Sequence, residues 1–103
     1  MIRVTALYPN TPGSRFDWKY YMDSHCPMAK AELAPLGLTD MKVDRVLSGG
    51  MGDPPAFHAI ASLTFGSMAE FQNAMQTAAP KLLADIPNYT DVSLQLQVSE
   101  AAL

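Results

Sequence analysis

The alternation of apolar and polar residues predicts four strands. The clearest covers residues 57–65, where apolar side chains occupy every second position, as in a strand with one apolar face. Residues 2–8 and 92–98 alternate in the same way, and residues 39–48 alternate less regularly. The segment 49–55 is rich in Gly and Pro, which predicts a long hairpin loop between the second and third strands.

A helix is expected between the first two strands. It begins at a capping residue, Ser14 or Asp17, and runs to about Ala34. Pro27 lies inside it and lacks the N–H that would bond the carbonyl of Asp23. We therefore expect this helix to kink or restart near Pro27.

A second helix is expected over residues 68–79. Ser67 and Glu70 have the spacing of a capping box at its start, and Pro80 is expected to end it. Residues 81–85 predict a short extra turn before the last strand.

The predicted elements follow the order β-α-β-β-α-β. In a chain of 103 residues this order is typical of a single α+β domain, here residues 1–103, with a ferredoxin-like fold. Such a fold has a four-stranded antiparallel sheet with both helices on one face. The uncovered face would combine apolar Leu7 and Ile60 with polar Thr5 and Ser62. A mixed face favours burial against a second copy, so we expect a homodimer; a monomer with a solvated face is the alternative.

Composition and charge exclude several classes of partner. The chain is 49% hydrophobic and 17% charged, with a formal net charge of −3. Its Lys and Arg residues are scattered, which argues against binding to nucleic acid or to a membrane surface. One cysteine cannot form an internal disulfide, and no segment has the pattern of a signal peptide or a membrane span. A cytoplasmic location is expected.

The first helix carries the candidate chemistry. Four of its residues have the spacing of one α-helical face: Trp18, Tyr21, Met22 and His25. Because the usual pKa of a histidine lies near neutrality, His25 is a candidate general acid or base, and Tyr21 could orient its ring or polarise a substrate oxygen. The alternative is a core histidine that hydrogen-bonds a backbone carbonyl and a tyrosine hydroxyl. Tyr20 lies about 100° round the helix and is interpreted as a packing residue.

Small residues in the third strand predict a cavity beneath His25. Ala59 and Ala61 stand between larger residues on the face that is expected to meet the helices. The expected substrate-binding residues are Trp18, Met22, Ala59, Ala61, Phe71 and Met75. Apolar walls with one or two polar groups suit a small apolar or phenolic molecule, and they also describe ordinary core packing.

The remaining reactive groups point to no second site. Cys26 is rotated about 100° from His25, so a buried, inert thiol is favoured over a Cys–His pair. His58 falls on the sheet face opposite the helices, unless a bulge shifts the register. No spacing suits a metal, and the glycines at 49–52 lack a phosphate-binding pattern, so neither a metal nor a cofactor is predicted.

Three segments resemble the EthD family. They are Tyr20-Tyr21-x-x-x-His25-x-Pro27 in the first helix, residues 61–67 at the end of the third strand, and residues 85–89 before the last strand. The resemblance implies a dimeric α/β-barrel made of two ferredoxin-like subunits. It also implies kinship with cofactor-independent isomerases, polyketide cyclases and quinone-forming monooxygenases.

Three hypotheses for function follow. In the first, a homodimer binds a small oxygenated molecule, and His25 transfers a proton with help from Tyr21 in a cofactor-free isomerisation, cyclisation or elimination. In the second, the same cavity serves a non-catalytic binding or accessory protein of an oxidative degradation pathway. In the third, the protein is a cofactor-free monooxygenase that acts on a phenolic substrate.

Overall fold

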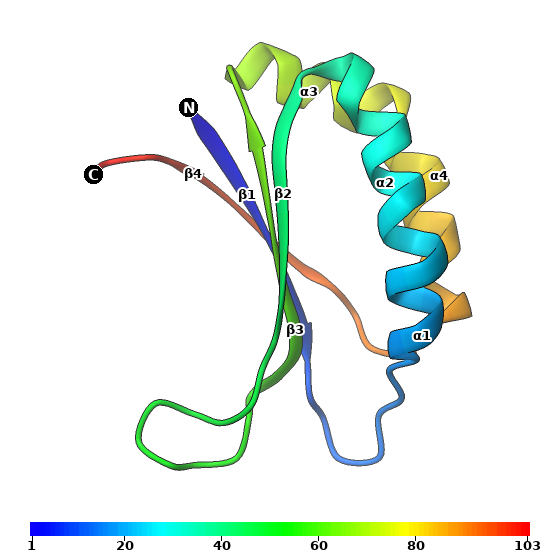
Figure 1. Ribbon diagram of the computed structural model, residues 1–103, viewed down its shortest axis with the longest axis vertical. Helices are drawn as coiled ribbons and strands as arrows, with labels where there is room; N and C mark the ends of the chain where they lie inside the picture. The colour runs from blue at the N-terminus through cyan, green and yellow to red at the C-terminus, as the bar shows by residue number, and fades with distance from the viewer.

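A computed structural model describes residues 1–103, and it places all helices along one face of an antiparallel sheet (Figure 1). The sheet contains β1 (Ile2–Pro9), β2 (Leu38–Arg45), β3 (Phe57–Phe65) and β4 (Gln95–Glu100) in the order β2-β3-β1-β4. Neighbouring strands are antiparallel throughout. The α+β, ferredoxin-like fold predicted from the sequence is therefore confirmed.

The first helical segment contains the predicted irregularity. It begins as α1 (Trp18–Tyr20), continues as a π-helical turn over Tyr21–His25, and becomes α2 (Cys26–Leu33). Within the π-turn the Cys26 N–H bonds the Tyr21 carbonyl, five residues back. This wider turn ends at His25, two residues before Pro27, whose missing N–H interrupts the α-helical hydrogen-bond pattern. A 3₁₀ turn, Ala34–Leu36, ends the segment.

The π-turn also changes which residues face inward. Because it carries one more residue than an α-helical turn, Tyr21 and Cys26 both become buried, and the Met22 side chain points outward with 47% of the residue exposed. The predicted single stripe of Trp18, Tyr21, Met22 and His25 is wrong at Met22. The spacing rule assumed α-helical geometry, which this segment does not have.

The second helical segment is longer than the sequence predicts. It consists of α3 (Met68–Thr77), α4 (Ala79–Asp85) and a 3₁₀ turn at Ile86–Asn88. Pro80 does not end a helix as expected; it is the second residue of α4, in the first turn, where its missing N–H breaks no helical bond. None of the helices is long and apolar enough to cross a membrane.

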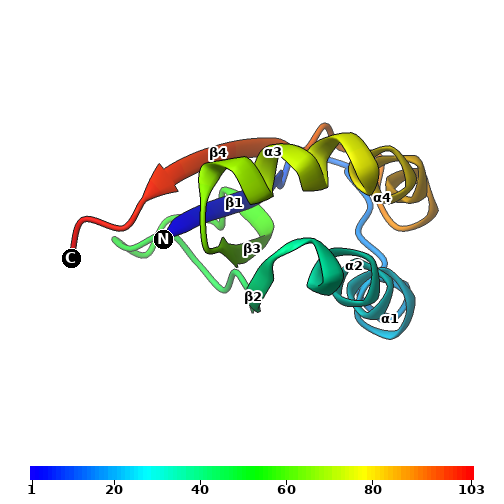
Figure 2. The same cartoon turned by 90° about the horizontal axis from the view of Figure 1, so that it is seen from above.

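Seen from above, the helices lie against one face of the sheet (Figure 2). The core between the sheet and the helices has two parts. The part near the start of α1, called here the tyrosine cluster, consists of Ala6, Tyr8, Tyr21, Cys26, Ala59, Ala61 and Tyr89. The other part, the apolar cluster, consists of Val4, Ala29, Leu33, Phe65, Ala74 and Ala78. Both parts contain residues of β1, β3 and α2. The same three elements therefore contribute to a core with tyrosines and to a core without them.

The other face of the sheet carries no helix (Figure 1). Strand register places Leu7 opposite Ile60 and Thr5 opposite Ser62 on this face. All four side chains are half-buried within the single chain. The mixed apolar and polar character predicted for the face is therefore present.

Candidate active site

His25 is the last residue of the π-turn and is only 7% exposed. Its Nδ1 lies 2.9 Å from Oδ2 of Asp85, the last residue of α4. Helix α4 also contacts α2, which follows the π-turn, through the ion pair of Lys81 with Glu32. The junction of α4 with the π-turn thus brings together a histidine and a carboxylate that are 60 residues apart in the chain.

Asp85 is held in its ionised form by its neighbours. Burial by itself raises the pKa of this carboxyl, but hydrogen bonds outweigh that effect and lower the pKa below its usual value. The donors include the Tyr20 hydroxyl, at 2.7 Å from Oδ1, and Asn88 Nδ2, at 2.9 Å from the same oxygen. An ionised carboxylate only accepts hydrogen bonds, so His25 must donate its Nδ1 proton to Asp85.

The opposite nitrogen of His25 faces a tyrosine. The Tyr89 hydroxyl lies 3.3 Å from Nε2, and the Tyr8 hydroxyl lies 2.8 Å from that of Tyr89. Burial raises the pKa of Tyr8 and of Tyr89, which keeps both hydroxyls protonated at neutral pH. The His25 ring also stacks on Tyr21, with ring centroids 5.6 Å apart and planes 15° apart.

Backbone pairing explains why Tyr89 and Asp85 meet the first helix. The Asp17 N–H, at the start of α1, bonds the Tyr89 carbonyl at 2.7 Å. Phe16 and Thr90 form an isolated antiparallel bridge next to it. The chain before the first helix is therefore pinned to the chain after α4, which fixes His25 relative to its two partners.

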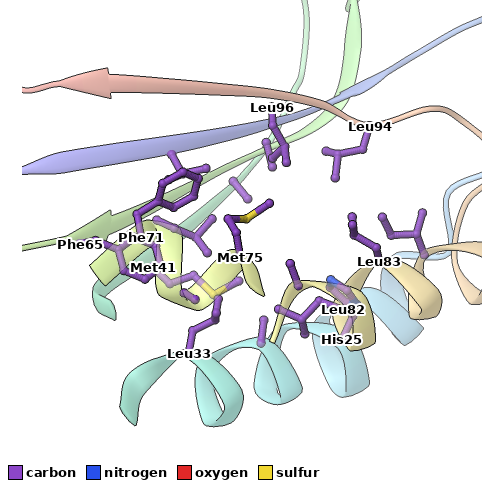
Figure 3. A pocket seen from close by; sticks show the side chains of 18 of the residues that line it. His25, Leu33, Met41, Phe65, Phe71, Met75, Leu82, Leu83, Leu94 and Leu96 are labelled. Atoms are coloured by element: carbon purple, nitrogen blue, oxygen red, sulfur yellow. The ribbon is translucent and has the colours of Figure 1, made fainter. Parts of the chain in front are cut away.

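A cavity of about 100 Å³ lies between the sheet and the helices. Nineteen of its 20 lining residues are hydrophobic, Tyr8 and Tyr21 included, and the exception is His25. Figure 3 shows His25 beside Leu82 and Leu83 of α4, with Leu94 and Leu96 on the β4 side. No cationic or acidic side chain lines the cavity, and the lining residues with a polar side-chain group are His25, Tyr8 and Tyr21.

Five of the residues singled out by sequence line this cavity. They are Tyr21, His25, Ala61, Phe71 and Met75. Ala61 lies on β3 at the floor of the space, and Phe71 and Met75 come from α3. Of the two small β3 residues that were predicted to leave room near His25, Ala61 therefore lines the cavity.

Trp18, Met22 and Ala59 lie outside the cavity, which corrects their predicted place in its lining. Trp18 packs on Phe16, with the Arg45 guanidinium 5.1 Å from its ring centre. Met22 points to solvent because of the π-turn. Ala59 is fully buried within the tyrosine cluster, so it contributes to packing and leaves no open space.

Tyr20 has more than the packing role expected for it. Its hydroxyl donates to Asp85, and this hydrogen bond raises the pKa of the Tyr20 phenol. The ring also stacks on Tyr89, at a centroid distance of 6.3 Å. Tyr20 therefore belongs to the group of side chains that positions the carboxylate.

His58 and Cys26 take no part in the cavity lining. His58 Nε2 lies 2.8 Å from the Ser14 hydroxyl, and its ring stacks on Phe16. Cys26 is buried and free, and burial raises the pKa of its thiol, so the unreactive protonated form is favoured. No group of three or more His, Cys, Asp or Glu side chains is arranged to hold a metal ion.

Sequence reasoning did not identify three polar residues around His25. They are Tyr8, Asp85 and Tyr89. Two of them fall in the segment 85–89 that resembles the EthD family, which was the only signal available for them. Tyr8 falls in the alternating segment 2–8 and has no chemical signal of its own in the sequence.

The comparisons agree on a family. Residues 14–93 match the EthD domain. The solved structure of an EthD-like protein from Ralstonia eutropha JMP134 is 41% identical in sequence, with a TM-score of 0.90, over 99% of this chain and 92% of that one. The chain therefore belongs to the EthD domain family. None of the curated proteins matches it.

Two more distant structures share the fold alone. SnoaB, a cofactor-independent oxygenase from Streptomyces nogalater, is 10% identical with a TM-score of 0.65, over 99% of this chain and 92% of that one. The hydroxynitrile lyase from Passiflora edulis is 14% identical with a TM-score of 0.67, over 99% of this chain and 95% of that one. This chain therefore has the same fold as an oxygenase and a lyase.

Proposed function

We propose that this protein binds a small, neutral, oxygenated molecule in the cavity and transfers a proton with His25, without a cofactor. The observation that carries the proposal is the Asp85–His25 pair, with a 2.9 Å hydrogen bond, at the wall of an otherwise hydrophobic cavity. A histidine oriented by a carboxylate is an arrangement well suited to general acid–base catalysis. Isomerisation, cyclisation and elimination all need such a proton transfer.

The chemistry follows from the hydrogen-bond directions. Because Nδ1 donates to the ionised Asp85, the neutral His25 ring has its lone pair on Nε2. Nε2 can receive a proton removed from the substrate, and the carboxylate then stabilises the imidazolium that forms. The proton returns to a different atom of the substrate in an isomerisation, or to the departing group in an elimination.

The lining of the cavity supports a substrate class. With no cationic side chain in the wall, a carboxylate or phosphate would be buried without a partner, which costs several kcal/mol or more. A neutral ketone, enol or phenol with an apolar body avoids this cost. Tyr21 contributes by stacking on His25 and by presenting a protonated phenol, since burial raises its pKa.

The proposal includes a homodimer formed through the uncovered face of the sheet. Leu7 and Ile60 lie side by side there among polar residues, and no element of the same chain covers them. Sedimentation of the purified protein should give twice the chain mass, and Ile60→Lys should give the monomer. A monomeric wild-type protein would contradict this assembly while leaving the chemistry at His25 open to its own test.

A hydrogen–deuterium exchange assay tests the catalytic proposal. Purified protein in D₂O would be mixed with a panel of neutral, hydrophobic ketones that can enolise, and deuterium uptake followed by NMR. We expect catalysed exchange in the wild type and a loss of about 10²–10⁴-fold in His25→Asn, the usual contribution of a general base.

Asp85→Asn should lose less than His25→Asn in the same assay. A hydrogen bond to a charged group contributes about 1.5–3 kcal/mol, which corresponds to roughly 10–100-fold in rate. His58→Asn is the matched control, because that ring lies outside the cavity and should keep full exchange. Ketones that bind without exchange, or exchange that survives His25→Asn, would contradict catalysis by His25 and favour a binding protein.

A further inference from the structure

Both ring nitrogens of His25 already have partners within the chain. Nδ1 is bonded to Asp85, and Nε2 faces the Tyr89 hydroxyl at 3.3 Å. Tyr89 is not among the cavity-lining residues, although its neighbour Tyr8 is. A ligand in the cavity therefore meets both Tyr8 and the His25 ring in the wall, but the lone pair of His25 Nε2 is already directed at the Tyr89 hydroxyl.

The directions of these hydrogen bonds are set by Asp85. Since His25 donates from Nδ1 to the carboxylate, Nε2 must accept, and the Tyr89 hydroxyl is its donor. The Tyr89 oxygen is then free to accept from the Tyr8 hydroxyl, 2.8 Å away. Burial raises the pKa of Tyr8 and a hydrogen bond from the Tyr21 hydroxyl lowers it, so the Tyr8 oxygen has one lone pair left for a donor in the cavity. The three bonds thus run in one direction, from Tyr8 to Asp85.

We propose that Tyr8 and Tyr89 form a proton relay between the cavity and His25, with Tyr8 as the catalytic residue that touches the substrate. The substrate gives its proton to the Tyr8 oxygen, Tyr8 passes its own proton to the Tyr89 oxygen, and Tyr89 passes its own to Nε2. The products are the substrate anion, two neutral tyrosines and an imidazolium paired with the Asp85 carboxylate. Charge and protons balance, and no oxidant or other reactant is needed.

The surroundings suit relay groups that pass a proton without retaining a charge. Tyr8 is 3% exposed and Tyr89 is fully buried, so a phenolate on either would be poorly solvated. Their rings lie 5.9 Å apart in an edge-to-face contact, which holds the two hydroxyls in place. The imidazolium, in contrast, has a carboxylate beside it. The proton therefore comes to rest on His25.

This relay rests on the proposed function of His25, and one experiment separates the two. The probe is 4-nitrophenol, a neutral phenol whose phenolate absorbs visible light, at a pH where the free probe is mainly protonated. Absorbance reports the ionisation of the bound probe, and ¹⁵N NMR of the histidine rings reports protonation of His25. His58, bonded to Ser14 and outside the cavity, is the internal reference.

In the wild type we expect the bound probe to be the phenolate and His25 to become an imidazolium. Tyr8→Phe and Tyr89→Phe keep the ring shape and should bind the probe as neutral phenol, with His25 unchanged. If Tyr8→Phe still gives the phenolate and the imidazolium, His25 takes the proton directly, which overturns the relay and leaves the proposed function standing.

A wild-type protein that leaves the probe neutral or unbound overturns the relay without any variant. Bound phenolate that persists in His25→Asn would contradict His25 as the proton acceptor, and so the proposed function as well. Each variant would first be checked for an unchanged His58 signal, which reports that the fold around the tyrosine cluster is intact.

Discussion

The tyrosine cluster and the apolar cluster lie on the same strands and the same helix, yet they differ in what holds them together. On β1, Val4 belongs to the apolar cluster and Tyr8 to the tyrosine cluster. On β3, Phe65 belongs to the apolar cluster and Ala61 to the tyrosine cluster. The apolar cluster is joined by dispersion and hydrophobic burial alone. The tyrosine cluster adds directed hydrogen bonds, from Tyr8 through Tyr89 to His25.

The difference explains which part of this small core can hold buried polar groups that react with a substrate. No buried side-chain nitrogen or oxygen lacks a hydrogen-bond partner in this protein. A buried polar group without a partner costs about 1–3 kcal/mol, so a polar cluster is tolerated only where its members satisfy one another. The backbone bridge between Phe16 and Thr90 holds the tyrosine cluster together at one end of the sheet, so its polar groups can hydrogen-bond one another. The other end can remain purely apolar and stabilise the fold.

The largest stability effect should come from the apolar cluster. Leu33 of α2 is 5% exposed, and Leu33→Ala should lower the free energy of unfolding by about 2–5 kcal/mol, since it deletes buried methyl groups and leaves a void. Urea unfolding followed by circular dichroism measures this loss. Leu33→Met, which conserves volume, should cost less than about 1.5 kcal/mol. A loss below about 1 kcal/mol for Leu33→Ala would show that this cluster does not secure the helices.

A smaller, pH-dependent effect should come from Asp85. Its pKa in the folded protein lies below the usual 3.8, so its contribution to stability is present above that value and is lost as the pH falls through the folded pKa. Stability of the wild type, measured by urea unfolding from near neutrality to about pH 3, should lose this contribution only at the acid end, below about pH 4. Asp85→Asn should be less stable near neutrality and should show a flatter acid decline. Parallel curves for the two proteins would contradict a stabilising role for the carboxylate.

The smallest effect concerns Cys26, and it tests whether the tyrosine cluster opens by itself. The thiol is buried and its pKa is raised by burial, so a thiol reagent such as dithionitrobenzoate should label native protein only as fast as the protein unfolds. In denaturant the same thiol should react at once. Fast labelling of native protein, without loss of circular dichroism, would show that the cluster opens locally and is less rigid than its hydrogen bonds indicate.

Local pattern was enough to predict most of the fold. The alternation from Phe57 to Phe65 gave the bounds of β3, and Ser67 caps α3 by accepting the Glu70 N–H, as the capping box predicts. Pro27 gave the position of the irregular turn but not its form. The turn is π-helical, with the Cys26 N–H bonded to the Tyr21 carbonyl, and Met22, predicted to face the core, is 47% exposed.

The site was less predictable because its bonds join distant parts of the chain. His25 could be named from its place on a helix and from a family resemblance. Its partners, Asp85 and Tyr89, lie 60 and 64 residues away, and no periodicity relates them to it. Tyr20 and Tyr21 are adjacent, and only the tertiary structure shows that one orients Asp85 while the other stacks on His25.

The tautomer of His25 tests the central claim most directly. In ¹⁵N NMR spectra of the unliganded protein, recorded where the ring is neutral, we predict a proton on Nδ1, bonded to Asp85, and a bare Nε2 that accepts from Tyr89. Asp85→Asn should weaken this preference, and His58 supplies the reference for an imidazole outside the cavity. A wild-type ring with its proton on Nε2 would contradict the account, because His25 would then have no lone pair directed to the tyrosines and the cavity.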